Sequence, residues 1–174
     1  MMKKLYLCLV LFGAILFSSV QAADAYVLGP GDQIEFKVYG QDDLTVNTLL
    51  SNSGLINYPF LGQIKVTGLS VKKVEQLIYR GLVGDYLVEP NVYVHVTQYR
   101  PFYIHGEVNK PGGYSYQPGM TVNQAIALAG GLTDRASEEK VFIYKESDKD
   151  KQINASLTYR VNAGDTITIE QRFF

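Results

Sequence analysis

The sequence predicts an α+β fold made of two small units, each with one main helix among short strands. Three observations lead to this prediction. Apolar and polar residues alternate along several short runs, as they do in half-buried strands. Two other runs place apolar residues at helical spacing directly after a Ser or Thr that can cap a helix. Glycine and proline occur between these runs, where they mark turns.

The first unit is expected to contain five strands and one helix. The apolar pattern predicts strands at 33–38, 45–50, 55–58, 61–66 and 91–97. The helix should follow Ser70, a natural N-cap, and bury the stripe of Val71, Val74, Ile78 and Leu82. Gly81 and Gly84 should weaken this helix and help to end it.

The second unit should begin after Tyr99-Arg100-Pro101, the expected joint between the units. A strand is predicted from Phe102 and a turn at 110–113, where Pro and Gly follow one another. Later strands are expected around 141–143 and 167–169, separated by a charged loop at 146–151.

The helix of the second unit lies inside a glycine-rich stretch, residues 108–132. Thr121 and Gln124 form a capping box at its start, and its buried stripe is Val122, Ala125, Ile126 and Ala129. Gly130-Gly131 follows the helix, where glycine forms a left-handed cap. Phosphate-binding loops instead place their glycines before a helix, and neither GxxxxGK[ST] nor GxGxxG occurs. We therefore interpret these glycines as caps and not as a nucleotide site.

Two short patterns occur once in each unit. GDxI occurs at 31–34 and 164–167, each time before an alternating strand, and Gx[ST]V occurs at 68–71 and 119–122 before each helix. Shared turn and cap chemistry explains both pairs more simply than an internal repeat does.

The N-terminus has the pattern of a secretory signal. Lys3 and Lys4 precede the apolar run 5–17, and Val20-Gln21-Ala22 offers a signal-peptidase site. We expect residues 1–22 to be removed and Ala23 to begin the mature protein. A retained anchor is the alternative, but the apolar run is shorter than a membrane span requires. Cys8, the only cysteine, lies inside this run and not at the cleavage point, so lipidation there is not expected.

Composition excludes several classes of function. A chain with one cysteine has no disulfide framework and no thiolate metal site. The 16 Lys and Arg residues balance 17 Asp and Glu residues, and they form no basic patch or stripe of the kind found in nucleic-acid-binding proteins. We therefore expect no nucleic-acid partner.

Several motifs resemble a known family. Tyr26-Val27-Leu28-Gly29-Pro30-Gly31-Asp32, followed by Gly54-Leu55-Ile56-Asn57-Tyr58-Pro59 and Gly62, resembles the polysaccharide export domain of bacterial outer-membrane polysaccharide exporters. The second unit resembles the SLBB module, a β-grasp-like fold, in Ile104-His105-Gly106-Glu107-Val108, Pro111-Gly112, Thr121, Ala129-Gly130-Gly131-Leu132 and Val161-Asn162-Ala163-Gly164-Asp165. The resemblance implies a polysaccharide export domain at 23–99 and an SLBB domain at 100–174.

The resemblance is to the short periplasmic members of the family, since the chain has no lipoprotein cysteine and one SLBB-like module. It implies a non-catalytic periplasmic component of a capsule or exopolysaccharide export conduit, associated with the outer membrane through partners. The implied partners are the polysaccharide, further copies in a homo-oligomeric ring, an outer-membrane β-barrel protein and an inner-membrane polysaccharide copolymerase. The candidate contact faces of the ring, taken as edge strands, bear Tyr93, His95, Tyr103 and His105. The alternative function is a soluble periplasmic module that binds a glycan or a small ligand.

No catalytic set is expected. Ser70 to Lys73 spells SxxK, but the partner motifs of penicillin-recognising enzymes do not occur, and Ser70 serves as the N-cap. His105 and Glu107 share a strand face and could hold a metal, yet His95 is the only other histidine, so a solvent-facing strand is favoured. Possible glycosidase carboxylates are interpreted as surface residues: Asp42, Asp43, Glu138 and Glu139. We therefore expect no enzyme, no catalytic residue, no cofactor and no metal.

The chain contains 13 tyrosines, and their rings could stack on carbohydrate. The preference of tyrosine for strands explains any single one of them more simply. Tyr114 and Tyr116 flank the turn before the second helix and are expected to be the most exposed pair.

Overall fold

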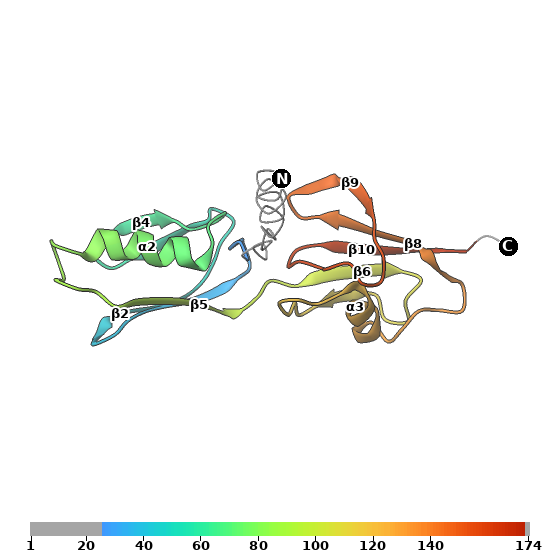
Figure 1. Cartoon of the computed structure of the whole chain (residues 1–174), viewed down its shortest axis with the longest axis horizontal. Coiled ribbons are helices and arrows are strands. Elements are labelled where there is room, and N and C mark those ends of the chain that lie inside the picture. Colours follow the sequence, from blue (N-terminus) through green and yellow to red (C-terminus); the bar gives the residue numbers. More distant parts are fainter. Residues whose placement is uncertain (1–25, 173–174) are drawn as a thin grey trace, which may run out of the picture.

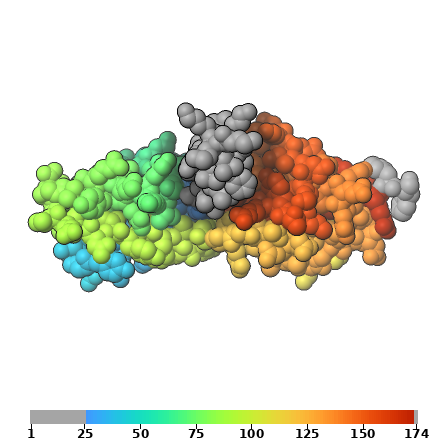
Figure 2. All heavy atoms as spheres, viewed as in Figure 1, coloured from blue at the N-terminus to red at the C-terminus, as the bar shows by residue number. Residues whose placement is uncertain are grey.

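The computed structural model of the protein describes residues 26–172 and shows an elongated molecule with one unit at each end (Figure 1). In Figure 2 the blue-green atoms of the first unit and the orange-red atoms of the second form its two ends. The expected signal sequence, residues 1–22, lies outside the described residues. The mixture of helices and strands confirms the α+β fold.

The first unit is built on a three-stranded antiparallel sheet in the order β2-β1-β5. The strands are β1 (Gln33–Val38), β2 (Gln41–Leu49) and β5 (Val92–Gln98). A hairpin of β3 (Leu55–Tyr58) and β4 (Gly62–Lys65) and the helix α2 (Val71–Leu82) complete the unit. Their inward side chains form one core, because Phe36 of β1, Tyr58 of β3 and Ile78 of α2 are all buried in the same cluster.

The second unit is a five-stranded sheet in the order β7-β6-β10-β8-β9 with one helix. Its elements are β6 (Phe102–Gly106), β7 (Gly112–Tyr114), α3 (Val122–Leu128), β8 (Ala136–Lys145), β9 (Asp148–Asn154) and β10 (Thr166–Gln171). The first and last strands, β6 and β10, pair in parallel at the centre, and the other pairs are antiparallel. Ala125 and Ile126 of α3 pack into one core with alternate residues of the three central strands, including Ile104, Ile143 and Ile167.

Both predicted helices and their caps are confirmed. The Ser70 hydroxyl accepts a hydrogen bond from the backbone N–H of Lys73, and Thr121 forms a reciprocal capping box with Gln124. Gly130 and Gly131 have φ of 79° and 87°, the left-handed values that a helix cap needs.

Gly81 is the penultimate residue of α2, which ends at Leu82, and it also has a packing role that the sequence did not indicate. A Cβ at this position would lie 2.7 Å from the Leu61 side chain, so the missing side chain makes room for the β3–β4 turn against the helix.

The strand predictions fail where the residues of a strand are charged, polar or glycine and therefore show no apolar alternation. The expected charged loop at 146–151 is a two-residue turn followed by β9, an edge strand whose alternating Lys and Asp residues face solvent. Charges on an edge strand discourage pairing with other chains. They also leave no apolar alternation from which the strand could be predicted. The expected turn at 110–113 is also wrong in part, because Gly112 and Gly113 pair with β6 as strand β7. Strand β2 begins at Gln41, four residues before the predicted start, because antiparallel pairing with β1 extends through polar residues.

Candidate functional site

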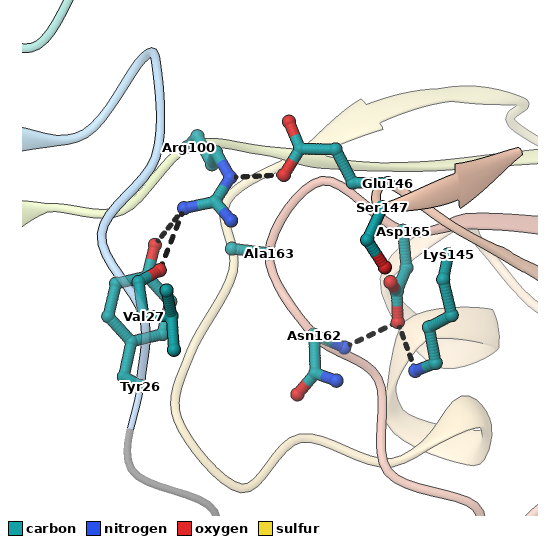
Figure 3. Close-up of a pocket in the computed structure, with 9 residues that line it drawn as sticks. All are labelled: Tyr26, Val27, Arg100, Lys145, Glu146, Ser147, Asn162, Ala163 and Asp165. Atoms are coloured by element: carbon teal, nitrogen blue, oxygen red, sulfur yellow. Dashed lines mark hydrogen bonds and ion pairs between the residues drawn. The ribbon is translucent and has the colours of Figure 1, made fainter. Parts of the chain in front are cut away.

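A cleft of about 360 Å³ lies where the two units meet (Figure 3). Its walls come from the first described residues, Tyr26 and Val27, from the connector at Arg100, from the β8–β9 turn, and from the loop that precedes β10. Segments far apart in the sequence therefore contribute to one polar site.

Arg100 is the centre of the hydrogen bonds on one side of the cleft. Its Nη1 donates to Asp32 Oδ2 at 2.8 Å and to the Tyr26 hydroxyl at 2.6 Å, and its Nε donates to Glu146 Oε2 at 2.8 Å. Its backbone N–H donates to Asp32 Oδ1 at 2.9 Å. Asp32 belongs to the first unit and Glu146 to the β8–β9 turn of the second, so one guanidinium joins the two units.

Asp165 holds the other side of the cleft. Its Oδ2 accepts hydrogen bonds from Lys145 Nζ and from the backbone N–H of Asn162, both at 2.8 Å. Asp32 and Asp165 are the two buried acids among the described residues, at 0% and 2% exposure. A buried carboxylate needs a partner charge and hydrogen bonds, and each of these acids has both.

Burial and the Asp32 charge govern the titration of the neighbouring tyrosines. Burial raises the pKa of Tyr26 strongly, and the hydrogen bond to Asp32 and the charge of Asp32 raise it further. Burial and the same carboxylate raise the pKa of Tyr99. Burial opposes the charge on Arg100, but its interactions with Tyr26, Asp32 and Glu146 outweigh this and raise its pKa. Tyr26 is thus a neutral donor and Arg100 a cation at neutral pH.

Three tyrosines close the junction beside this network. Tyr26 packs edge-on against Tyr99 at 4.8 Å between ring centroids, and Tyr99 packs edge-on against Tyr116 at 5.6 Å. Tyr26 also contacts the cores of both units. The charged groups of the cleft are already paired with one another, so the arrangement fixes the two units together and offers no free acid or base.

The predicted metal-binding candidates do not come together. His105 Nε2 lies 3.0 Å from Thr168 Oγ1, and His95 Nε2 lies 3.3 Å from Glu35 Oε2 in the other unit. Glu107 accepts hydrogen bonds from Thr133 and Arg135, which lower its pKa. Within residues 26–172 no three His, Cys, Asp or Glu side chains lie close enough to hold a metal ion.

The candidate catalytic residues are also dispersed. Asp42 and Asp43 are exposed on β2 of the first unit, whereas Glu138 and Glu139 are exposed on β8 of the second. Ser70 serves as the cap of α2, as expected.

The prediction for Tyr116 was wrong. It is 8% exposed and packs at the junction between the units, while Tyr114 is half-buried and donates from its hydroxyl to the carbonyl of Lys110 at 2.6 Å. A local pattern of turn residues does not show that a neighbouring unit covers the ring. Tyr93 and Tyr103 are exposed instead, at 45% and 50%.

One of the two expected contact edges is not an edge. Tyr103 and His105 lie on β6, which pairs with β7 on one side and β10 on the other. Tyr93 and His95 do lie on an edge strand, β5, but the carboxylate of Glu75 in α2 accepts a hydrogen bond from the Val94 backbone N–H at 3.0 Å. The edge of β5 is therefore partly satisfied within the unit.

Sequence reasoning missed the Asp32–Arg100–Glu146 link, because pairing between residues 46 and 68 positions apart leaves no periodic signal. The signal that could have found it is GDxI, since an acid before a buried strand in each unit needs a partner cation. It also missed Phe60, which has φ of 64° and an exposed ring stacked on Tyr86 at 4.8 Å. No helix within residues 26–172 has the length and apolar character needed to span a membrane.

Comparison with known proteins follows the same division of the chain. Residues 20–97 match the family described as polysaccharide biosynthesis/export protein, and residues 101–153 match the SLBB domain. The exopolysaccharide production protein ExoF of Rhizobium meliloti is 32% identical over 66% of this chain and 30% of its own length. The polysialic acid transport protein KpsD of Escherichia coli is 28% identical over 70% of this chain and 24% of its own.

The EPS I polysaccharide export outer membrane protein EpsA of Ralstonia nicotianae is 26% identical over 82% of this chain and 40% of its own length. The chain thus spans well under half the length of these curated relatives. The two matched domains occur in the order that the sequence motifs predicted. The chain therefore belongs to the polysaccharide biosynthesis/export protein family, with an SLBB domain after its export domain.

Proposed function

We propose that this protein is a non-catalytic component of a machine that exports a capsular or extracellular polysaccharide. The observation that supports this most strongly is the export domain followed by an SLBB domain, matched over most of the chain. The Arg100 link adds a physical reason, because a guanidinium bonded to both units favours a single rigid body over two independent binding modules. The proposed domain bounds are 23–99 and 100–174.

The proposed location is the periplasm, in association with the outer membrane through partners. Residues 1–22, acting as a secretory signal, would direct the protein there and then be removed. The intact mass of protein purified from its native host tests this step: a chain that begins at Ala23 without acyl groups is expected, and retained residues 1–22 or an added lipid would contradict it.

We further propose that copies of the chain form a homo-oligomeric ring between an outer-membrane β-barrel protein and an inner-membrane polysaccharide copolymerase. A single small unit is filled by its own core, and a closed symmetric ring is the simplest way to enclose a channel with such subunits. Strand β5, with Tyr93 and His95, remains a candidate contact because it is an edge of its sheet.

Cysteine cross-linking in intact cells tests the ring. Tyr93→Cys on β5 is expected to give adducts with a second copy or an envelope partner, whereas Asp150→Cys on the charged edge strand β9 serves as the control. Normal export without any Tyr93→Cys adduct would contradict this contact.

The export function is tested by a clean deletion of the gene. Loss of extracellular polymer is expected while the enzymes of polymer synthesis remain present. The alternative is a periplasmic module that binds a glycan or small ligand, and it predicts an unchanged amount of surface polymer. That outcome would rule out the export function.

A further inference from the structure

We infer that the outer face of the five-stranded sheet, the face opposite α3, binds a stretch of uncharged glycan chain. This inference rests on the proposed export function and names the surface that would contact the polymer. The inference derives from the register of strands β6, β10, β8 and β9.

The two outward threonines of β10 are each flanked by rings on both sides. Thr166 lies opposite Tyr103 of β6 and Tyr144 of β8. Two residues further along, Thr168 lies opposite His105 of β6 and Phe142 of β8. In each of these two rows of opposed residues, a threonine hydroxyl therefore lies between two aromatic rings.

Strand β9 adds an amide to each row. Gln152 lies opposite Tyr144, and Asn154 lies opposite Phe142. We call these eight side chains the ring–threonine face: Tyr103, His105, Phe142, Tyr144, Gln152, Asn154, Thr166 and Thr168.

The ring–threonine face is accessible. Tyr103 is 50% exposed, His105, Gln152 and Asn154 are exposed, and the other four side chains are half-buried. The residues that alternate with them along the strands, such as Ile104, Ile143 and Ile167, are buried against α3 in the core. The rings are thus not needed to fill the interior of the unit.

The chemistry of this face fits sugar residues that carry no charge. None of its eight side chains is Asp, Glu, Lys or Arg; the nearest charged residues at alternate positions of the same strands, Lys140, Asp150 and Glu170, lie just beyond it. Tyrosine and phenylalanine offer apolar ring faces to the C–H groups of a sugar. Threonine, glutamine and asparagine between and beside the rings offer donors and acceptors to its hydroxyl groups.

The spacing of the strands suits an extended polymer that lies across them. Neighbouring strands are about 4.8 Å apart, so Tyr103 and Tyr144, two strands apart, stand roughly 10 Å from each other. The contact between His105 Nε2 and Thr168 Oγ1, 3.0 Å, holds one ring in place before any ligand arrives. A preorganised ring loses less freedom when it binds.

Binding of the host's own purified extracellular polysaccharide to the purified protein tests the inference, with backbone and side-chain NMR as the readout. Shifts or broadening are expected on the ring–threonine face, and binding should persist at high salt because no charge pair is involved. The double variant Tyr103→Ala with His105→Ala should weaken binding by about tenfold or more.

The first unit supplies a matched control. Tyr93 and His95 are the same two residue types at the same spacing on strand β5, also on a solvent-facing side. Strand β5 is proposed above as a contact between copies and not as a glycan surface, so Tyr93→Ala with His95→Ala should leave the affinity of a single protein molecule for the glycan unchanged. Both double variants are therefore compared with wild type at a protein concentration at which all three are monomeric. Thermal unfolding of both double variants checks that each is folded, and Thr168→Val provides a milder second variant on the ring–threonine face.

Four outcomes would overturn the inference. These are no binding by the wild type, shifts elsewhere on the protein, equal losses in the two double variants, or binding that disappears at high salt. Shifts on this face that follow protein concentration without glycan would assign it to a second copy instead. If gene deletion abolishes export while Tyr103→Ala with His105→Ala binds and exports normally, only this inference fails; unchanged export after deletion overturns the proposed function itself.

Discussion

Asp32 and Asp165 occupy the same position in two copies of one turn. Each carboxylate accepts a hydrogen bond from the backbone N–H three residues earlier, Gly29 in one case and Asn162 in the other, at 2.9 and 2.8 Å. Each follows a glycine with positive φ and precedes an interior strand of its sheet, β1 or β10. The GDxI pattern thus marks a shared turn, as its interpretation from turn chemistry predicted.

The two acids differ in their partners. Arg100 neutralises Asp32 and continues to Glu146 across the junction, whereas Lys145 neutralises Asp165 within the second unit. One copy of the turn therefore supports a single unit, and the other copy also supports the contact between the units.

Replacing Asp32 should destabilise the protein strongly. Asp32→Ala leaves Arg100, whose side chain is 13% exposed, without its buried partner, and breaking such a pair costs about 3–5 kcal/mol. Asp165→Ala should cost less, because Lys145 is 21% exposed and its amine can turn to water. Urea unfolding measures both, with the exposed Asp43→Ala as the control. An Asp32→Ala variant within about 1 kcal/mol of wild type would show that the pair contributes little.

Loss of Arg100 should loosen the junction more than loss of Glu146. Arg100→Ala removes the side-chain bonds to Tyr26, Asp32 and Glu146, whereas Glu146→Ala removes one bond of a carboxylate that is 38% exposed, which is worth about 0–1 kcal/mol. Chymotrypsin, which cleaves after tyrosine, should cut Arg100→Ala at Tyr99 much faster than wild type. Equal cleavage rates in Arg100→Ala and Glu146→Ala would contradict a joining role for Arg100.

Local chemistry explains what could be predicted from the sequence. A capping box needs only Thr121 and Gln124, and the helix stripe that includes Ile78 repeats within one element. Both features are complete within a few residues, so periodicity and cap rules find them.

The remaining features depend on parts of the chain that are distant in sequence. Strand β9 forms because β8 lies beside it, although its own Lys and Asp residues carry no apolar pattern. Tyr116 is buried because Tyr26 and Tyr99 pack against it from another unit. The ring–threonine face combines residues of four strands, so it can be recognised only from their register. Propensity and pattern do not contain such information.

Gly106 should tolerate no side chain. Its φ is 90°, and a Cβ there would collide with the backbone carbonyl of Ile169, which cannot move without breaking the pairing of β6 with β10. Gly84 has the same φ of 90° but nothing within 4 Å of its Cβ position. Gly84→Ala should therefore cost only the left-handed strain of about 1–2 kcal/mol, whereas Gly106→Ala should cost several times more or prevent folding. The two variants are compared by the amount of soluble protein and by thermal unfolding. Equal stabilities would mean that the backbone at Ile169 can move at little cost.

Tyr58 should make the first unit sensitive to alkaline pH. Its ring is 1% exposed, its hydroxyl donates to the carbonyl of Leu44 at 2.9 Å, and burial raises its pKa from 10.0 to about 12. The folded state therefore keeps the proton that the unfolded chain releases above pH 10. This contribution to stability is complete below pH 10 and is lost as the pH rises from 10 to about 12.

The variant Tyr58→Phe isolates this effect, because the other tyrosines whose pKa is raised, Tyr26, Tyr99 and Tyr116, are present in both proteins. Well below pH 10 the variant should be less stable by about 1 kcal/mol or somewhat more, since the Leu44 carbonyl loses its donor. Between pH 10 and about 12 the wild type loses the Tyr58 contribution and the variant does not, so the difference in unfolding free energy should shrink. Denaturant unfolding across this range, with tyrosinate absorbance followed in parallel, measures the change. A difference that stays constant up to pH 12 would show that Tyr58 is not kept neutral by the core.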